Sequence, residues 1–185
     1  LLVHLARTDA QYYYRAPKKK FFFAGQEGPD GLRRKVIDAL VDVDLPREVR
    51  FNGVWGAPLP VDGELANYYT EQMLECAFAV CPAGTGQATL RIYEACFFGR
   101  VPIVIADCRL VWEDVYDTSF ALRLDPRLER QQLANVLATI YEGMSISEME
   151  SRGMDARRYF DKVVRRYFTD PTGFFLHWAR IKGLI

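Results

Sequence analysis

Arg91 and Glu94 are two charged residues inside a segment that is otherwise almost entirely apolar. The segment, CPAGTGQATLRIYEACFFGRVPIVIAD, runs from Cys81 to Asp107 and has the pattern of a strand, a turn, a helix and a second strand. Arg91 falls in the first turns of that helix, where the helix dipole disfavours a cation, so a bound anion would explain its position. Glu94 follows three residues later on the same face of the helix.

Two interpretations of this charged pair remain open at the level of the sequence. Arg91 and Glu94 could form an ordinary ion pair on the solvent side of a helix, because residues three apart are neighbours there. The surrounding residues are apolar, however, which is typical of a helix buried nearly all round. Charges on a buried helix need a water-filled cleft or a polar ligand, and this requirement favours a binding site.

A short glycine-containing loop precedes the helix and comprises Gly84, Thr85 and Gly86. Glycine lets the backbone turn sharply and lets a ligand approach it closely. The free N–H groups at the start of the following helix suit a phosphate. The pattern is neither GxGxxG nor a Walker motif, and an ordinary strand-to-helix turn can have the same composition. The loop therefore indicates a phosphate site only in combination with Arg91.

The composition narrows the classes of function. The chain has 24 Lys and Arg against 24 Asp and Glu, and this zero net charge argues against a general nucleic-acid-binding protein. Its four cysteines form no CxxC pair and its two histidines lie far from them in sequence, so a zinc site is not expected. The cysteines all lie in or beside apolar segments, as buried free thiols do. No run of about 18 apolar residues occurs.

Strands and helices alternate along most of the chain. Continuous apolar runs predict buried strands at residues 20–25, 77–82 and 101–107, with further strands at 48–55 and 120–125. Apolar residues at helical spacing predict helices at 32–41, 65–76, 128–141 and 147–168. A last helix follows, with Asp170 as its cap and Pro171 at its first position.

This alternation predicts an α/β fold. Strands that are apolar throughout are typical of a parallel sheet covered on both faces. Right-handed crossovers then give a doubly wound, Rossmann-like domain, whose ligands bind beyond the carboxyl ends of the strands. The Cys81 end of one strand and the Asp107 end of the next are two such positions.

The segment from Phe78 to Asp117 resembles the exostosin-type glycosyltransferase domain. The family pattern is roughly F-x-L-C-P-R-G, a short loop, S-x-R-x-Y-E-A, then G-x-x-P-V-I-x-x-D and a stretch containing Pro-Phe. The matching positions are Phe78, Cys81, Pro82, Gly84, Arg91, Tyr93, Glu94, Ala95, Gly99, Pro102, Val104, Ile105 and Asp107, with Thr89 where Ser is usual. The likeness extends from about Lys20 to Phe168. Ala83 stands where the family usually has Arg, and Val111–Trp112 stands where Pro-Phe is usual.

The resemblance implies a GT-B glycosyltransferase, which is built from two facing Rossmann-like domains. Residues 20–168 would form the donor-binding domain, residues 1–19 a tail or linker from a missing N-terminal acceptor domain, and residues 169–185 a C-terminal helix. The implied reaction is an inverting transfer from a UDP- or GDP-linked sugar to a glycan or polysaccharide acceptor, without a metal or other cofactor.

The resemblance also implies a role for individual residues. Arg91 would neutralise the diphosphate of the donor and Glu94 would accept hydrogen bonds from its ribose hydroxyls. Further hydrogen-bond donors would come from Gly84, Thr85, Gly86 and Thr89. Asp107, Arg109 and Trp112 would border the donor pocket, although a tryptophan in a loop can equally cap the core. The resemblance implies that the catalytic base comes from the N-terminal acceptor domain, as is usual in two-domain transferases. Asp107 and Glu113 are the only arguable candidates in this chain.

Two other functions are compatible with the same residues. One is a nucleotide-sugar epimerase with the GT-B architecture, which analysis of the products would distinguish. The other is a non-catalytic nucleotide-sugar-binding or interaction module, which the alanine at position 83 makes plausible. Hydrolysis or transfer of a donor sugar would exclude the second possibility.

Overall fold

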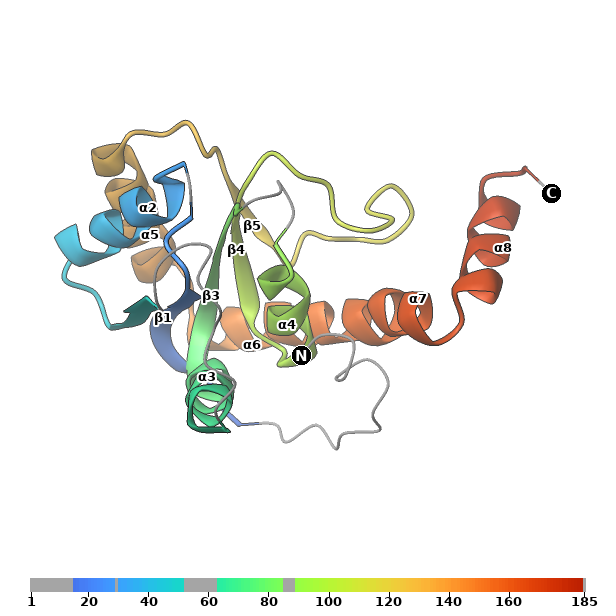
Figure 1. Ribbon diagram of the computed structural model, residues 1–185, viewed down its shortest axis with the longest axis horizontal. Coiled ribbons are helices and arrows are strands. Elements are labelled where there is room, and N and C mark those ends of the chain that lie inside the picture. Colours follow the sequence, from blue (N-terminus) through green and yellow to red (C-terminus); the bar gives the residue numbers. More distant parts are fainter. Residues whose placement is uncertain (1–14, 29, 52–62, 85–88, 185) are drawn as a thin grey trace.

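The computed structural model describes residues 15–28, 30–51, 63–84 and 89–184, without the side chains of residues 63, 65 and 66. This part of the chain forms an α/β domain around a five-stranded parallel sheet with helices on both faces (Figure 1). The predicted doubly wound, Rossmann-like fold is therefore confirmed.

The elements follow the predicted order. The strands are β1 (Lys18–Gly25), β2 (Arg47–Phe51), β3 (Cys76–Pro82), β4 (Val101–Ile105) and β5 (Leu122–Leu124). The helices are α2 (Leu32–Asp42), α3 (Gly63–Glu75), α4 (Arg91–Phe97), α5 (Arg130–Gly143), α6 (Ile146–Tyr159), the π-helical turn η1 (Phe160–Val164), α7 (Arg165–Thr169) and α8 (Pro171–Ile181). The last strand is shorter than predicted, because Phe120 and Ala121 lie in the turn before β5.

The sheet has the strand order β2-β1-β3-β4-β5. The chain passes from β1 to β2 on one side and then returns to β3 on the other side of β1. The direction of winding therefore reverses between β1 and β3, and the carboxyl ends of these two strands form the topological switch point. Gly25 ends β1 and Gly84 follows β3 at this point. The β3 end was one of the two predicted ligand positions, whereas the β4 end lies one strand further along.

Both faces of the sheet are buried, which explains the absence of polar alternation in the strands. Phe21 and Phe23 pack with α2 and α5 in one core cluster, whereas Phe22 packs with α3 and α4 in the other. All three side chains are 0% exposed. Burying a phenylalanine stabilises a fold by roughly 1.5–3 kcal/mol, so this run holds β1 firmly beside the switch point.

The helix that carries Arg91 is short. It begins at Arg91 itself and ends before Gly99, which adopts a left-handed φ of 62°. The Arg100 N–H donates to the carbonyl of Ala95 at 2.9 Å, so the chain turns back at Gly99 and enters β4 at once. This tight exit fixes the position of α4 relative to the sheet.

The C-terminal part forms a long helical rod followed by a separate helix. α6, η1 and α7 are continuous from Ile146 to Thr169, close to the predicted range of 147–168 (Figure 1). The wider π-helical turn brings Phe160, Val163 and Val164 together into the core. Asp170 caps α8 as predicted, since its carboxylate accepts from the Gly173 N–H at 3.0 Å, and Pro171 is the first residue of the helix.

The four cysteines are free thiols, as the sequence predicts. Cys76, Cys81 and Cys96 are buried and Cys108 is partly exposed. Burial raises the pKa of Cys76 to about 12, so its thiol stays protonated at neutral pH. Among the helices of the described residues, none is long and apolar enough to span a membrane.

Candidate functional site

Arg91 reaches from α4 across the sheet to the end of β1. Its Nη2 donates a hydrogen bond to the carbonyl of Ala24, and its guanidinium carbon lies 4.6 Å from the centre of the Phe23 ring. A Cβ on Gly25 would lie 2.5 Å from Nη2, so the glycine provides the space for this approach. The Arg91 side chain therefore lies at the topological switch point.

The remaining hydrogen-bonding capacity of Arg91 is not used within the described residues. Its Nε and Nη1 atoms are buried, and neither has a hydrogen-bond partner among them. Buried polar atoms in proteins nearly always have a partner, and an unpaired guanidinium N–H is costly. Within that part of the chain, Arg91 and Glu94 form no ion pair with each other. The interpretation of these two residues as an ion pair on the solvent side of the helix is therefore wrong.

Glu94 is held by a tyrosine of α3. The hydroxyl of Tyr69 donates to Glu94 Oε2 at 2.6 Å, and the Tyr69 ring packs edge-on against Phe22 with 5.4 Å between ring centres. Burial raises the pKa of Tyr69 well above its ordinary value, and the Glu94 carboxylate raises it further. The hydroxyl therefore stays protonated and donates to the carboxylate. Arg91 lies close enough to Tyr69 that its positive charge opposes this rise in pKa. Arg91, Glu94 and Tyr69 therefore belong to one site.

The glycine loop lies only partly within the described residues. Gly84 lies two residues beyond the end of β3, whereas Thr85 and Gly86 lie outside the described residues. Thr89 is buried, at 8% exposure, and its carbonyl accepts from the Ile92 N–H at 3.2 Å at the start of α4. Gly84 and Thr89 thus lie on either side of the undescribed residues, in the connection between β3 and α4.

A second arginine, Arg33, lies at the same switch point and is not evident from sequence. It is the second residue of α2, and it donates from Nε to the Ala83 carbonyl at 3.1 Å and from Nη1 to the Gln26 carbonyl at 2.8 Å. Partial burial lowers the pKa of Arg33, and the positive charge of Arg91 lowers it further. Asp30 partly offsets this effect. The family that the sequence resembles usually has an arginine at position 83. In this chain position 83 is alanine, and the guanidinium of Arg33 lies against its backbone.

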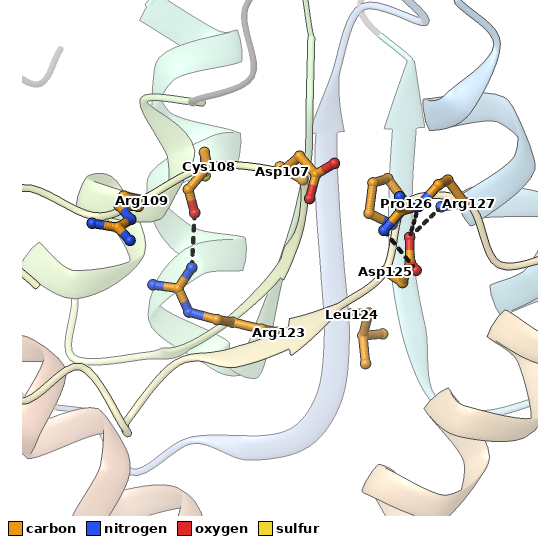
Figure 2. A pocket seen from close by; sticks show the side chains of 9 residues that line it. Asp107, Cys108, Arg109, Arg123, Leu124, Asp125, Pro126 and Arg127 are labelled. Atoms are coloured by element: carbon orange, nitrogen blue, oxygen red, sulfur yellow. Dashed lines mark hydrogen bonds and ion pairs between the residues drawn. The ribbon is translucent and has the colours of Figure 1, made fainter.

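Asp107 and Arg109 lie one strand away, at an open groove beyond β4 and β5. The groove has a volume of about 630 Å³ and is lined by Ala106, Asp107, Cys108, Arg109, Arg123, Leu124, Asp125, Pro126 and Arg127. Figure 2 shows Arg123 bound to the Cys108 carbonyl, at 2.8 Å, and Arg127 bound to Asp125. The Asp107 carboxylate has no such bond to the residues drawn there.

Trp112 is separated from this groove and packs against α8. Its ring stacks on Phe174 with centres 3.4 Å apart and lies nearly parallel to the ring of Tyr116. Together with Phe175 and Trp178 it lines a hollow of about 290 Å³, which Arg109 also borders. Trp112 therefore forms a contact between its loop and the C-terminal helix α8.

Glu113, one of two arguable bases, is already engaged by its neighbours. Its Oε2 atom accepts from the Leu110 N–H at 2.9 Å and from Arg123, and its Oε1 atom lies 3.6 Å from Arg109 Nε. A carboxylate held by two guanidinium groups and a backbone N–H fixes the loop after β4. It is poorly placed to take a proton from a substrate.

One Asp-x-Asp triplet in the sequence has the spacing of a metal–diphosphate bridge. It is Asp42–Val43–Asp44, at the end of α2. Asp42 binds Arg130 through Nε at 2.6 Å, and Asp44 lies 3.8 Å from Arg47 at the start of β2. The triplet lies at the amino edge of the parallel sheet, opposite the switch point. Among the described residues, no group of three or more His, Cys, Asp or Glu could hold a metal ion.

Comparisons with known proteins do not assign the chain. A scan against models of protein families found no match, and a search of curated proteins found none either.

Proposed function

We propose that this chain is the nucleotide-sugar-binding domain of an exostosin-like glycosyltransferase. The observation that carries the proposal is the Arg91 side chain at the switch point, where buried Nε and Nη1 atoms lack a partner among the described residues. A diphosphate would supply acceptors for both atoms and a charge that opposes that of the guanidinium. The switch point of a doubly wound sheet is also where such folds bind nucleotides.

In the proposed reaction, an acceptor hydroxyl oxygen attacks the anomeric carbon of the donor sugar. The bond from that carbon to the diphosphate oxygen breaks as the new bond to the acceptor oxygen forms, and the configuration at that carbon is inverted. The nucleotide diphosphate departs with the bonding electrons, and Arg91 stabilises the charge that it acquires. Glu94, oriented by Tyr69, accepts hydrogen bonds from the ribose hydroxyls.

The proton of the acceptor hydroxyl needs a general base. Glu113 is held by Arg109 and Arg123, and Asp107 is exposed at the β4 end, one strand from Arg91. We therefore assign the base to an acceptor domain that faces this one, as the resemblance implies.

The proposal is tested by titrating the protein with UDP, GDP and their sugar conjugates in a calorimeter. Wild type should bind one of the two nucleotide classes. Arg91→Gln should weaken that binding by about ten- to a hundred-fold, because it removes charge-assisted hydrogen bonds. Arg130→Gln, an exposed arginine of α5 paired with Asp42, is the matched control and should bind normally. Equal affinity of wild type and Arg91→Gln would contradict the assigned role.

A second candidate is a module that binds a nucleotide sugar without transferring it. The observation that favours it is the engagement of Glu113 by Arg109 and Arg123, which leaves Asp107 as the other arguable base in this chain. Incubation of the protein with radiolabelled donor and glycan acceptors separates the possibilities. Labelled glycan indicates a transferase, a changed donor sugar indicates an epimerase, and unchanged donor that nevertheless binds indicates the module.

A further inference from the structure

We propose that Arg33 is a second phosphate-binding cation of this site, and that Arg33 and Arg91 together bind a diphosphate between the ends of β1 and β3. This inference rests on the proposed function, since it assigns an additional residue to the same ligand.

The Arg33 guanidinium is held at the switch point by the backbone beyond both strands. It bridges the two strands at the switch point, since Nη1 donates to the carbonyl of Gln26 just beyond β1 and Nε donates to the carbonyl of Ala83 just beyond β3. These two bonds, of 2.8 and 3.1 Å, fix the plane of the guanidinium. An arginine anchored in this way is pre-organised and loses little side-chain freedom when it binds a ligand.

Two glycines provide the space that the two guanidinium groups occupy. A Cβ on Gly84 would lie 2.2 Å from Arg33 Nη2, and a Cβ on Gly25 would lie 2.5 Å from Arg91 Nη2. No real side chain tolerates such distances, so any residue larger than glycine would displace the guanidinium. Each arginine thus lies against the backbone of a glycine, one on each side of the switch point.

The two guanidinium groups are close enough for Arg91 to lower the pKa of Arg33, in addition to the effect of partial burial. Asp30 attracts Arg33 but does not reverse the shift. Two partly buried like charges repel each other, and an anion with charge on two adjacent phosphates would turn this repulsion into attraction. Pyrophosphate and nucleoside diphosphates have that charge distribution, whereas orthophosphate has a single phosphate group.

The experiment compares three ligands on four proteins by calorimetry. The ligands are inorganic pyrophosphate, orthophosphate and whichever of UDP and GDP binds wild type. The proteins are wild type, Arg33→Gln, Gly84→Ala and the control Arg34→Gln. Arg34 is the next residue of α2, but it is exposed and paired with Glu27 at 2.7 Å. Removing it changes the net charge equally without touching the switch point.

Arg33→Gln should lower the affinity for pyrophosphate and the nucleotide by about ten-fold or more. It should lower the affinity for orthophosphate much less, because a single phosphate is served by Arg91 alone. Gly84→Ala should have the same pattern by displacing the guanidinium, and it keeps the inference testable if Arg33→Gln does not fold. Arg34→Gln should match wild type.

The outcomes separate this inference from the proposed function. If wild type binds the nucleotide, and Arg33→Gln and Gly84→Ala bind it and pyrophosphate equally well, the role of Arg33 is wrong and the proposed function stands. An equal loss of affinity for pyrophosphate and orthophosphate would reduce Arg33 to a structural residue and also overturn the inference. If wild type binds no nucleoside diphosphate and no pyrophosphate, both proposals are wrong.

Discussion

At the scale of residues, the defining feature of the site is that Arg91 and Glu94 do not bind each other but have separate partners. Arg91 donates to the Ala24 carbonyl at the end of β1, and Glu94 accepts from Tyr69 of α3. The two charges are therefore held apart by partners from different elements. This arrangement leaves each with capacity for a ligand, whereas a direct ion pair would consume it.

The role of Tyr69 can be tested with its sequence neighbour as a control. Tyr69→Phe removes the hydroxyl that orients Glu94, so the carboxylate should lose its fixed position toward the ribose. We expect the affinity for UDP or GDP to fall about three- to ten-fold, in line with the loss of part of a charge-assisted hydrogen bond. Pyrophosphate, which has no ribose, should bind unchanged.

Tyr68→Phe is the matched control for that substitution. Tyr68 donates an equivalent hydrogen bond to Glu48 at 2.5 Å, but Glu48 belongs to β2, beyond β1 and away from the site. Both variants should therefore bind pyrophosphate alike and differ only with nucleotides. A matching loss of nucleotide affinity in the two variants would show that Tyr69 has no specific role.

At the scale of elements, the short helix α4 is fixed by its packing against α6. A Cβ on Gly153 of α6 would lie 2.2 Å from the carbonyl oxygen of Gly99, at the exit of α4. That neighbour is backbone and cannot move aside as the end of a flexible side chain can. The close approach of α6 therefore holds the exit of α4, and with it the base of the candidate site.

Gly153→Ala should destabilise the protein by about 1–3 kcal/mol, because the methyl group forces the two helices apart. Gly143→Ala is the comparison, since Gly143 ends α5 with no atom within 4 Å of the added Cβ. It should leave stability unchanged or raise it by about 0.4–1 kcal/mol. Urea unfolding followed by circular dichroism measures both. Equal urea midpoints of unfolding for Gly153→Ala and wild type would show that the contact between α6 and the exit of α4 leaves room for a methyl group.

The elements were more predictable from sequence than the site. The apolar runs of β1, β3 and β4 and the cap at Asp170 are local signals, and each is confirmed in place. Arg33 and Tyr69 join Arg91 and Glu94 only through the crossovers of the sheet, and no local spacing encodes that meeting. Trp112 was ambiguous for the same reason, because its stacking partner Phe174 lies in α8.

At the scale of the whole molecule, the described residues offer two regions at the carboxyl edge of the sheet that could receive a ligand. One is the switch point between β1 and β3, with Arg33 and Arg91. The other is the open groove beyond β4 and β5, with Asp107 and Arg127. In the groove, Arg127 is paired with Asp125, and Arg123 is bound to Glu113. Arg127 and Arg123 thus already have carboxylate partners, and we place the diphosphate at the switch point.

The most direct test of this account is an NMR titration that follows the arginine Nε–H signals as UDP or GDP is added, with EDTA present throughout. The Arg91 signal is assigned by its loss in Arg91→Gln. We predict that it shifts or slows in exchange with solvent at saturating nucleotide, because its buried Nε gains a phosphate partner, while the signals of Arg123 and Arg127 stay in place. Shifts confined to Arg123 and Arg127, with the Arg91 signal unmoved, would contradict the central claim.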